Sequence, residues 1–312
     1  MRDFRFGFNF RDIPSRAALV DRCRLAEHFG YDVALVPDHL GGPAPFTMMV
    51  AAAEATERMR VGTLVLNVPF WNPHLLAREV STADVLTDGR VELGLGAGHM
   101  KWEFDAAGIE WRPFGPRAQM LEETIQELGR LFAGPEYPER TAIRAAGGLT
   151  ELKPVQRRGF DGSGPPLVVG GTGDRVLRVA ARYADTVAYG GVYQIKGEPP
   201  GTFRLGNADE AEERVRFVGG LMGERADEVE SSVLIQLVAV TGDRRAEAAR
   251  LAAGPLAFLT AEEILETPFV LLGTHAQIAE QLVERRERFG YSYITVHGVS
   301  MEALGPVIEL LR

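Results

Sequence analysis

Cysteine and clustered positive charge are scarce in this 312-residue sequence. Cys23 is its one cysteine, so no disulfide can form within the chain, and we expect a reducing compartment. The net charge of −9 argues against nucleic acid and against an anionic membrane as partners, because both require a clustered basic surface. Any anion that the chain binds must therefore be held by local dipoles and a few placed cations.

Long apolar runs are also missing. No stretch approaches the roughly 20 apolar residues that a membrane span needs. The first twelve residues lack the apolar core and cleavage site of a signal peptide, so we expect a cytoplasmic location. Apolar residues still make up 46% of the sequence and charged residues 25%, which is the balance of a globular protein with a large core.

Strand-like and helix-like patterns alternate along the chain. Phe4 to Phe10 alternates aromatic with other residues, which predicts a strand, and residues 16–30 carry apolar residues at helical spacing up to a capping Gly30. The alternation continues through about eight units, and eight parallel strand–helix units close a (β/α)8 TIM barrel. The predicted strands are 4–10, 33–36, 61–68, 91–95, 167–169, 185–189, 232–241 and 291–297; among the predicted helices are 46–58, 73–87, 117–132 and those started by the capping boxes Thr260/Glu263 and Thr274/Gln277.

Two stretches interrupt the repeat. Residues 134–164 are rich in Gly, Pro and Arg and predict an insertion after the fourth unit. Residues 190–206 form a Gly- and Pro-rich loop, long enough to indicate function or mobility. We expect the whole chain, residues 1–312, to be a single barrel domain.

A glycine loop follows the fifth predicted strand. Residues 167–169 are apolar and β-branched, Gly170 to Gly173 follow at once, and a helical pattern begins directly after them. The free N–H groups of a helix start attract anions, and glycine lets an anion approach the backbone closely. The pattern therefore predicts a phosphate site; a tight turn without a ligand is the alternative.

A TIM barrel places its site at the carboxyl ends of the strands. The residues expected there are Asn9, Asp38, His39, 64–69, 96–101, Gly170, Gly171, Thr172, Tyr189 and His297.

Five stretches, taken together and in this order, resemble the bacterial luciferase-like monooxygenase superfamily, and more closely its branch that uses the deazaflavin coenzyme F420. They are VPDHL (36–40), NPHLLAREVSTADVLTDGRVELGLGAG (72–98), RAQMLEETIQELGRLFAG (117–134), PPLVVGGTGDRVLRVAARYAD (165–185) and FVLLGTHAQIAEQLVERRERFGYSYITV (269–296). The resemblance covers most of the chain.

The resemblance implies a barrel of the luciferase-like type with an insertion after its fourth unit, and a homodimer. It also implies a flavin-type ring across the strand ends, with its phosphate at Gly170, Gly171 and Thr172. A non-proline cis peptide at Leu64–Val65 would support that ring. The glycine-rich Gly96, Ala97 and Gly98 would approach the coenzyme tail; Lys101 stands where a dinucleotide fingerprint would need its third glycine.

Three residues are candidates for proton transfer. His39 follows a predicted strand, and the matching family histidine faces the reactive part of the ring; an imidazole can exchange the proton that accompanies hydride transfer. Asp38 is a weaker candidate, because a turn contact explains it nearly as well. His99 stands where some F420 enzymes of the superfamily carry a glutamate acid, so it either donates a proton in its place or only faces the mouth of the site.

The sequence predicts an oxidoreductase that transfers hydride between F420 and a small organic substrate; the alternative is a monooxygenase that uses flavin mononucleotide (FMN). Lys101, Arg175 or Arg178 near the groove would favour the acidic tail of F420. Two other classes remain open. His39, His74 and His99 could serve a metal-dependent hydrolase, although ligand pairs at helical spacing are missing. A non-catalytic flavin-binding protein would keep the glycine loop without needing His39.

Overall fold

Eight parallel strands close into a barrel in the computed structural model, which describes residues 2–134 and 152–312. The strands follow one another around the ring as β3, β2, β1, β13, β10, β7, β6 and β5, and pairing of β3 with β5 closes it. Their bounds are β1 (Arg5–Asn9), β2 (Val33–Val36), β3 (Arg60–Thr63), β5 (Val91–Gly96), β6 (Leu167–Gly170), β7 (Thr186–Tyr189), β10 (Glu230–Ile235) and β13 (Tyr293–His297); the short β4 (Leu66–Asn67) extends the line of β3. The predicted TIM barrel is confirmed.

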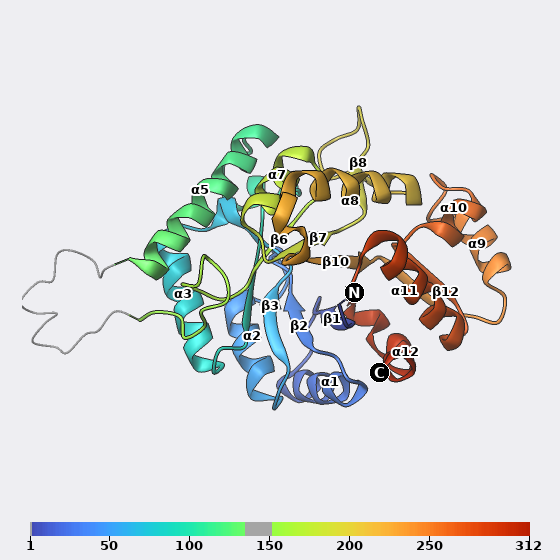
Figure 1. The fold of residues 1–312 in the computed structure, drawn as a ribbon, viewed down its shortest axis with the longest axis horizontal. Helices are drawn as coiled ribbons and strands as arrows, with labels where there is room; N and C mark the ends of the chain where they lie inside the picture. The colour runs from blue at the N-terminus through green and yellow to red at the C-terminus, as the bar shows by residue number, and fades with distance from the viewer. Residues whose placement is uncertain (1, 135–151) are drawn as a thin grey trace, which may run out of the picture.

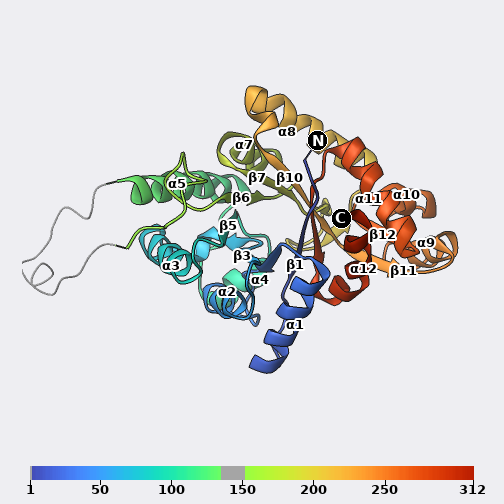
Figure 2. The same cartoon turned by 60° about the horizontal axis from the view of Figure 1, so that its bottom comes forward.

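Helices surround the strands on the outside (Figures 1 and 2). They are α1 (Arg16–Phe29), α2 (Pro45–Glu54), α3 (Pro73–Leu86), α4 (Lys101–Ala107), α5 (Phe114–Ala133), α7 (Asp174–Tyr183), α8 (Ala208–Met222), α9 (Arg244–Ala252), α10 (Ala261–Glu266), α11 (His275–Phe289) and α12 (Met301–Leu311), with the 3-10 turns η1 (Val68–Phe70), η2 (Gly223–Asp227) and η3 (Gly298–Ser300). Within the two described ranges, no helix is long and apolar enough to cross a membrane.

The core between barrel and helices explains the aromatic alternation of β1. Phe6, Phe8 and Phe10 are fully buried, and the ring of Phe8 contacts Tyr31 at 5.4 Å between ring centroids. Gly7 points the other way, since a Cβ added there would lie 3.0 Å from the Tyr293 ring inside the barrel. The period of two therefore separates residues that face the helices from residues that face the barrel interior.

The predicted helix ends are mostly confirmed. Gly30 ends α1 with a left-handed backbone (φ 90°), and capping boxes start α10 at Thr260 and α11 at Thr274. The helix expected over 46–58 is wrong at its end, because α2 stops at Glu54. The Glu27 carboxylate accepts the backbone N–H groups of residues 57, 58 and 59 at 2.8–3.1 Å, which holds them in a turn instead.

The strand expected over 232–241 is two strands. The chain leaves the barrel at Gln236, whose N–H donates to the Phe269 carbonyl, and β11 (Leu237–Val240) then pairs in parallel with β12 (Val270–Gly273) outside the ring. Figures 1 and 2 show this pair beside α9 and α10 at one side of the barrel. The predicted loop 190–206 contains an antiparallel hairpin, β8 (Val192–Gln194) and β9 (Phe203–Leu205).

The expected insertion, residues 134–164, lies between α5 and β6, and its residues 135–151 fall outside the described part of the chain. Gln156 from its described part reaches back to the barrel. The Gln156 side chain donates to the Asp84 carboxylate (2.6 Å) and to the Val91 carbonyl (2.8 Å), and it accepts from Arg60 (2.9 Å).

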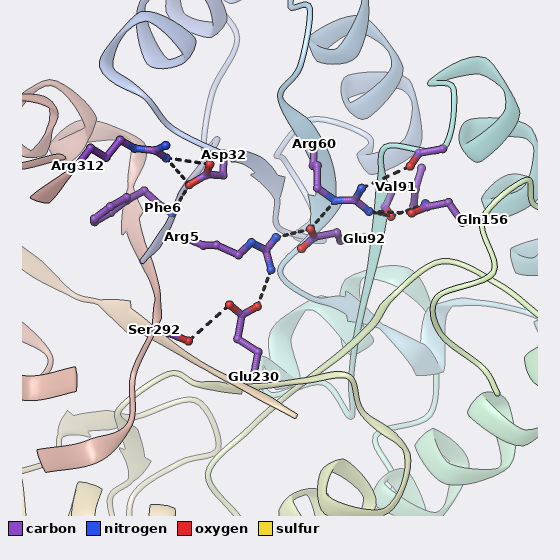
Figure 3. A network of polar contacts seen from close by, with 11 residues as sticks. Arg5, Phe6, Asp32, Arg60, Val91, Glu92, Gln156, Glu230, Ser292 and Arg312 are labelled. Atoms are coloured by element: carbon purple, nitrogen blue, oxygen red, sulfur yellow. Dashed lines mark hydrogen bonds and ion pairs between the residues drawn. The ribbon is translucent and has the colours of Figure 1, made fainter. Parts of the chain in front are cut away.

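An ion-pair network lies at the amino ends of the strands (Figure 3). Arg5 donates to the Glu92 and Glu230 carboxylates, and Arg60 donates to Glu92 at 2.6 Å. Both carboxylates are buried, with 2% and 5% exposure, and burial raises the pKa of Glu230 although Arg5 opposes the shift. Each cation and each carboxylate in this cluster has a partner of opposite charge.

Candidate active site

The opposite end of the barrel, formed by the carboxyl ends of the strands, gathers the predicted site residues. Asp38 and His39 follow β2, residues 97–99 follow β5, Gly171 and Thr172 follow β6, and His297 ends β13. We call this end the mouth. Residues separated by up to 288 positions meet there, as Asn9 and His297 do through their side chains.

His39 is held by a carboxylate that the sequence did not reveal. Its Nδ1 lies 2.9 Å from Oε1 of Glu103, and the same oxygen accepts the backbone N–H of Leu40 at 3.0 Å. Glu103 is 1% exposed, whereas the His39 side chain is 40% exposed. A carboxylate only accepts, so Nδ1 carries a proton, and in the neutral form of the ring Nε2 has the lone pair. Among the described residues Nε2 has no hydrogen-bond partner, so it is available at the mouth.

Glu103 sits on the short helix α4, between Trp102 and Phe104. An acidic residue flanked by aromatic residues is the local signal that could have pointed to a buried carboxylate, although the sequence analysis did not use it. Nothing in the sequence, however, links it to a histidine 64 positions earlier.

The Asp38 carboxylate is held by hydrogen bonds from the segment that follows β3. Its Oδ2 accepts the backbone N–H of Asn67 at 3.0 Å and the indole N–H of Trp71 at 2.9 Å. These contacts join the end of β2 to β4 and η1, so the structure gives Asp38 a positioning role. Its assignment as a catalytic residue remains a prediction.

His99 completes an aromatic group with His39. The two rings meet edge to face with centroids 5.4 Å apart, and Phe203 of β9 contacts His99 from another side at 5.6 Å. His99 is exposed to solvent, yet the atoms around it remove much of its hydration. This desolvation, together with repulsion between a protonated His99 and the neighbouring His39 and Arg117, lowers the pKa of His99 to about 4. His99 is therefore neutral at physiological pH.

The Leu64–Val65 peptide bond is cis, as the resemblance implies. The neighbouring glycines of β5 have a structural reason of their own. A Cβ at Gly96 would lie 2.5 Å from the Val65 side chain, and one at Gly98 would lie 2.3 Å from the Asn67 amide oxygen. Gly96 and Gly98 thus make room for the chain between β3 and η1; their contact with a coenzyme remains a prediction.

Arg117 fixes the loop after β5. This buried guanidinium donates to the carbonyl of Ala97 at 3.0 Å and to that of Gly98, and it lies 3.7 Å from the centre of the Trp111 ring. Burial lowers the pKa of Arg117 to about 10. The carbonyls of Ala97 and Gly98 therefore point toward Arg117 and away from any anion.

The glycine loop leaves the start of α7 uncovered by its own side chains. Gly170, Gly171 and Gly173 have none, and the Thr172 hydroxyl donates to the Val192 carbonyl at 3.0 Å. The backbone N–H groups of residues 174–176 have no backbone acceptor among the described residues. This is the arrangement that binds phosphate at a helix start.

One cation that the sequence analysis missed lies beside this loop. Arg214 of α8 contacts the Thr172 carbonyl at 3.4 Å and pairs with the Asp174 carboxylate. Of the predicted cations, Arg175 lies near the loop with its guanidinium against Gly115. The other two lie elsewhere: Lys101 pairs with Asp105 at 2.6 Å, and Arg178 lies over the Phe217 ring.

The three histidines considered for a metal site do not converge. His74 lies on α3 with its Nε2 3.4 Å from the Glu127 carboxylate, apart from the pair of His39 and His99. Across residues 2–134 and 152–312, no group of three or more His, Cys, Asp or Glu side chains is arranged to hold a metal.

Known proteins share this arrangement of strands and loops. The chain is 34% identical over 179 residues to the F420-dependent glucose-6-phosphate dehydrogenase of Nocardia farcinica, a match that covers 54% of this chain and 51% of that one. Across the curated relatives it matches, the chain spans between 37% and 51% of their length.

Solved structures agree with the fold along the whole chain. The coenzyme F420-dependent tetrahydromethanopterin reductase of Methanopyrus kandleri superposes with a TM-score of 0.71 at 18% identity, covering 100% of both chains. The FMN-bound oxygenating constituent of 3,6-diketocamphane monooxygenase of Pseudomonas putida superposes with a TM-score of 0.68 at 16% identity, covering 99% of this chain and 96% of that one. The profile of one family matches residues 9–196, more than half of the chain, and the chain belongs to that family, the luciferase-like monooxygenases.

Proposed function

We propose that this chain is an oxidoreductase that transfers hydride between coenzyme F420 and a small organic alcohol or carbonyl compound. The observation that carries the proposal is the contact of His39 with the buried Glu103, which leaves Nε2 of His39 as a proton acceptor at the mouth. The relatives described as F420-dependent support this choice of coenzyme.

The residues of the mouth fit a phosphorylated ring coenzyme. Gly170, Gly171 and Thr172 leave the N–H groups of α7 open for its phosphate, and the Arg214 guanidinium, which pairs with Asp174 and Glu213, lies beside them. Leu64, Val65, Gly96, Ala97 and Gly98 would line the ring side of the same mouth. When bound, F420 supplies the hydride acceptor or donor.

His39 handles the proton of the reaction. In the oxidation of an alcohol, Nε2 of His39 takes the proton of the hydroxyl group. The carbon that carries this group loses its hydrogen as hydride, and the C=O bond forms between that carbon and the oxygen. The Glu103 carboxylate stabilises the imidazolium that results and holds the ring in place. In the reverse direction His39 returns the proton to the carbonyl oxygen.

His99 and Asp38 have separate roles in this scheme. Neutral His99 is a hydrogen-bond partner for the substrate oxygen beside His39, and its lowered pKa opposes the alternative role of a second proton donor. Asp38 keeps β2 and η1 in register behind His39. A small-molecule substrate, a single barrel domain, a homodimer and a cytoplasmic location complete the proposal.

Parallel calorimetric titration of the coenzyme-free protein with F420 and with FMN tests the coenzyme. Tight binding of F420 alone is the expected result, and it leads to a screen of secondary alcohols under anaerobic conditions. Preference for FMN would shift the assignment to the monooxygenase alternative. Binding of neither would refute the proposal.

A further inference from the structure

His297 lies at the mouth in a hydrogen-bond chain that fixes its protonation. The Gln236 amide donates from Nε2 to the Gly190 carbonyl at 2.6 Å, so its oxygen faces the imidazole, where it lies 3.1 Å from Nε2 of His297. An amide oxygen only accepts, so Nε2 of His297 carries the proton. His297 is 9% exposed, and desolvation, with the nearby charge of Arg11, lowers its pKa to about 4.

Nδ1 of His297 is therefore an acceptor, and two donors reach it. The Asn9 amide lies against Nδ1 with its nitrogen 3.1 Å and its oxygen 3.3 Å away, and a terminal nitrogen of Arg11 lies 3.2 Å away. The same Arg11 nitrogen is 3.4 Å from Nε2, which places the guanidinium against the ring. Neutral His297 thus orients Arg11 without cancelling its charge.

Arg11 keeps that charge at the mouth. Its side chain is exposed, and no carboxylate among the described residues pairs with it. The neighbouring Asp12 is bound to Arg22 of α1 at 3.1 Å instead. An oriented guanidinium with free N–H groups matches an oxyanion, which it binds through two parallel hydrogen bonds.

Arg11 and the proposed proton acceptor His39 follow neighbouring strands at the mouth. Asn9 and His297 are register partners on β1 and β13, and β2, which leads to His39, pairs with β1 on its other side. In a chain with a net charge of −9, a cation at the mouth selects for an anionic ligand.

Building on the proposed function, we propose that Arg11, held by neutral His297, binds an oxyanion group of the substrate. The substrate class is then an alcohol or carbonyl compound that carries a carboxylate or a phosphate ester beside the reacting carbon. Asn9 and Gln236 act through His297, and they are positioning residues for Arg11.

Binding is tested first, without coenzyme and without turnover. The Nε resonances of arginine are followed by 15N NMR in the full chain during titration with acetate, inorganic phosphate and neutral acetamide. We expect saturable shifts of the Arg11 resonance with acetate or phosphate and none with acetamide. The stronger of the two anions identifies the oxyanion. No shift of the Arg11 resonance with either anion would overturn the proposal, as would shifts of other arginine resonances that are the same in the wild type and in Arg11→Gln.

Arg24→Gln is the matched control, because it removes an equal charge from an exposed position of α1. Arg24→Gln should bind the anions like the wild type, and equal weakening in the two variants would indicate a general charge effect and refute the subsite. Arg11→Lys keeps the charge without the planar group and should bind with intermediate affinity.

Turnover then links the subsite to the substrate. With the F420-loaded enzyme, lactate and 3-hydroxybutyrate are compared with propan-2-ol and butan-2-ol. In Arg11→Gln, kcat/KM for the acids should fall about 10- to 100-fold further than kcat/KM for the neutral alcohols, as expected for a lost charge-assisted contact. An equal fall for both kinds of alcohol would contradict the proposal.

A failure of the proposed function is distinguishable from a failure of this inference. If anions bind at Arg11 but F420 does not bind the protein, only the function is wrong. If F420 binds and neutral alcohols turn over without any anion response, only the subsite is wrong. A loss of F420 affinity in Arg11→Gln without acetate or phosphate binding would assign Arg11 to the acidic coenzyme tail and overturn the inference.

Discussion

The two ends of the barrel differ in whether their charged side chains are paired. At the amino ends of the strands, Arg5, Arg60, Glu92 and Glu230 neutralise one another in a buried cluster (Figure 3). At the mouth, Arg11 contacts the neutral His297, and no carboxylate within residues 2–134 and 152–312 pairs with it. Charges that are fully paired hold the barrel together, whereas an unpaired charge leaves interaction capacity for a ligand. Changes at the first end should therefore affect stability, and changes at the mouth should affect binding and turnover.

The largest effect should come from Arg5→Gln at the amino ends. The change leaves the carboxylates of Glu92 and Glu230 buried without this cation, and breaking a buried ion pair costs about 3 kcal/mol or more. Urea unfolding measures the loss, and coenzyme affinity should not change. Arg22→Gln, which removes an exposed pair with Asp12, should cost less than about 1 kcal/mol. Equal losses in the two variants would contradict the comparison.

Next is His39→Ala at the mouth. Turnover should fall by roughly 10²-fold or more, the scale of general acid–base catalysis, because the proton acceptor is lost. Coenzyme affinity should stay close to the wild type, whereas the free energy of unfolding should fall by about 1–3 kcal/mol, because the buried Glu103 carboxylate loses its side-chain partner. His28→Ala on α1 controls for removal of an exposed histidine. Unchanged turnover in His39→Ala would remove His39 from the mechanism.

The pH dependence of stability should also separate the two ends. The folded state lowers the pKa of His297 to about 4, against about 6.5 in the unfolded chain, so the unfolded chain binds more protons between these values. The contribution of neutral His297 to the free energy of unfolding is complete above pH 6.5 and is lost as the pH falls toward 4. Each pKa unit corresponds to about 1.4 kcal/mol, so roughly 2 kcal/mol should be lost between pH 6.5 and pH 5.

His297→Gln removes this dependence, because glutamine does not titrate. Urea unfolding at several pH values should show that the free energy of unfolding of the variant falls less than that of the wild type below pH 6.5. We call this part of the pH curve the acid limb. Glu230 gives a pH dependence of the opposite sign, because the folded state raises its pKa. The contribution of Glu230 to the free energy of unfolding is present at low pH and declines as the pH rises above the ordinary pKa of a glutamate. An unchanged acid limb in His297→Gln would show that His297 is not neutral at the mouth.

Glu103→Gln should reduce kcat about tenfold, because the imidazolium of His39 loses a charged partner while the shape of the side chain is kept. The KM for substrate and the affinity for coenzyme should change little. The His39 Nδ1–H proton resonance should move upfield, which a purely structural role would not cause. Glu110→Gln, an exposed carboxylate paired with Arg112, is the control. A kcat equal to the wild type would exclude Glu103 as a positioning residue.

Local features of the structure followed from the sequence, and contacts between distant segments did not. The aromatic alternation before Asn9, the Gly30 cap and the capping boxes at Thr260 and Thr274 are encoded within a few residues, and all were predicted. The strand ends then located His39 and His297 at the mouth, because parallel strands end together. Glu103 was missed because its partner lies 64 positions away.

The same reason explains the wrong strand and the wrong helix end. Between residues 233 and 240 Gln236 is the one polar residue, and a single polar residue does not predict that β12 replaces the barrel as the pairing partner there. The α2 helix ends early because Glu27, thirty positions before, captures the N–H groups of residues 57–59. Tertiary contacts override local preference at both places.

We expect the smallest effect, a change in the affinity for F420, from substitutions in one ion pair at the glycine loop. Arg214 pairs with Asp174 beside the open N–H groups of α7. Arg214→Gln leaves the Asp174 carboxylate next to the coenzyme phosphate, so the affinity for F420 should fall about three- to tenfold, the range of a partly exposed charge near a helix start. Asp174→Asn removes the negative charge and keeps Arg214, so affinity should rise or stay the same. Both variants lose the same ion pair, and calorimetric titration with F420 separates a charge effect from the loss of that pair. A similar fall in both variants would mean that the pair only stabilises α7 and α8, and the phosphate would then lie elsewhere at the mouth.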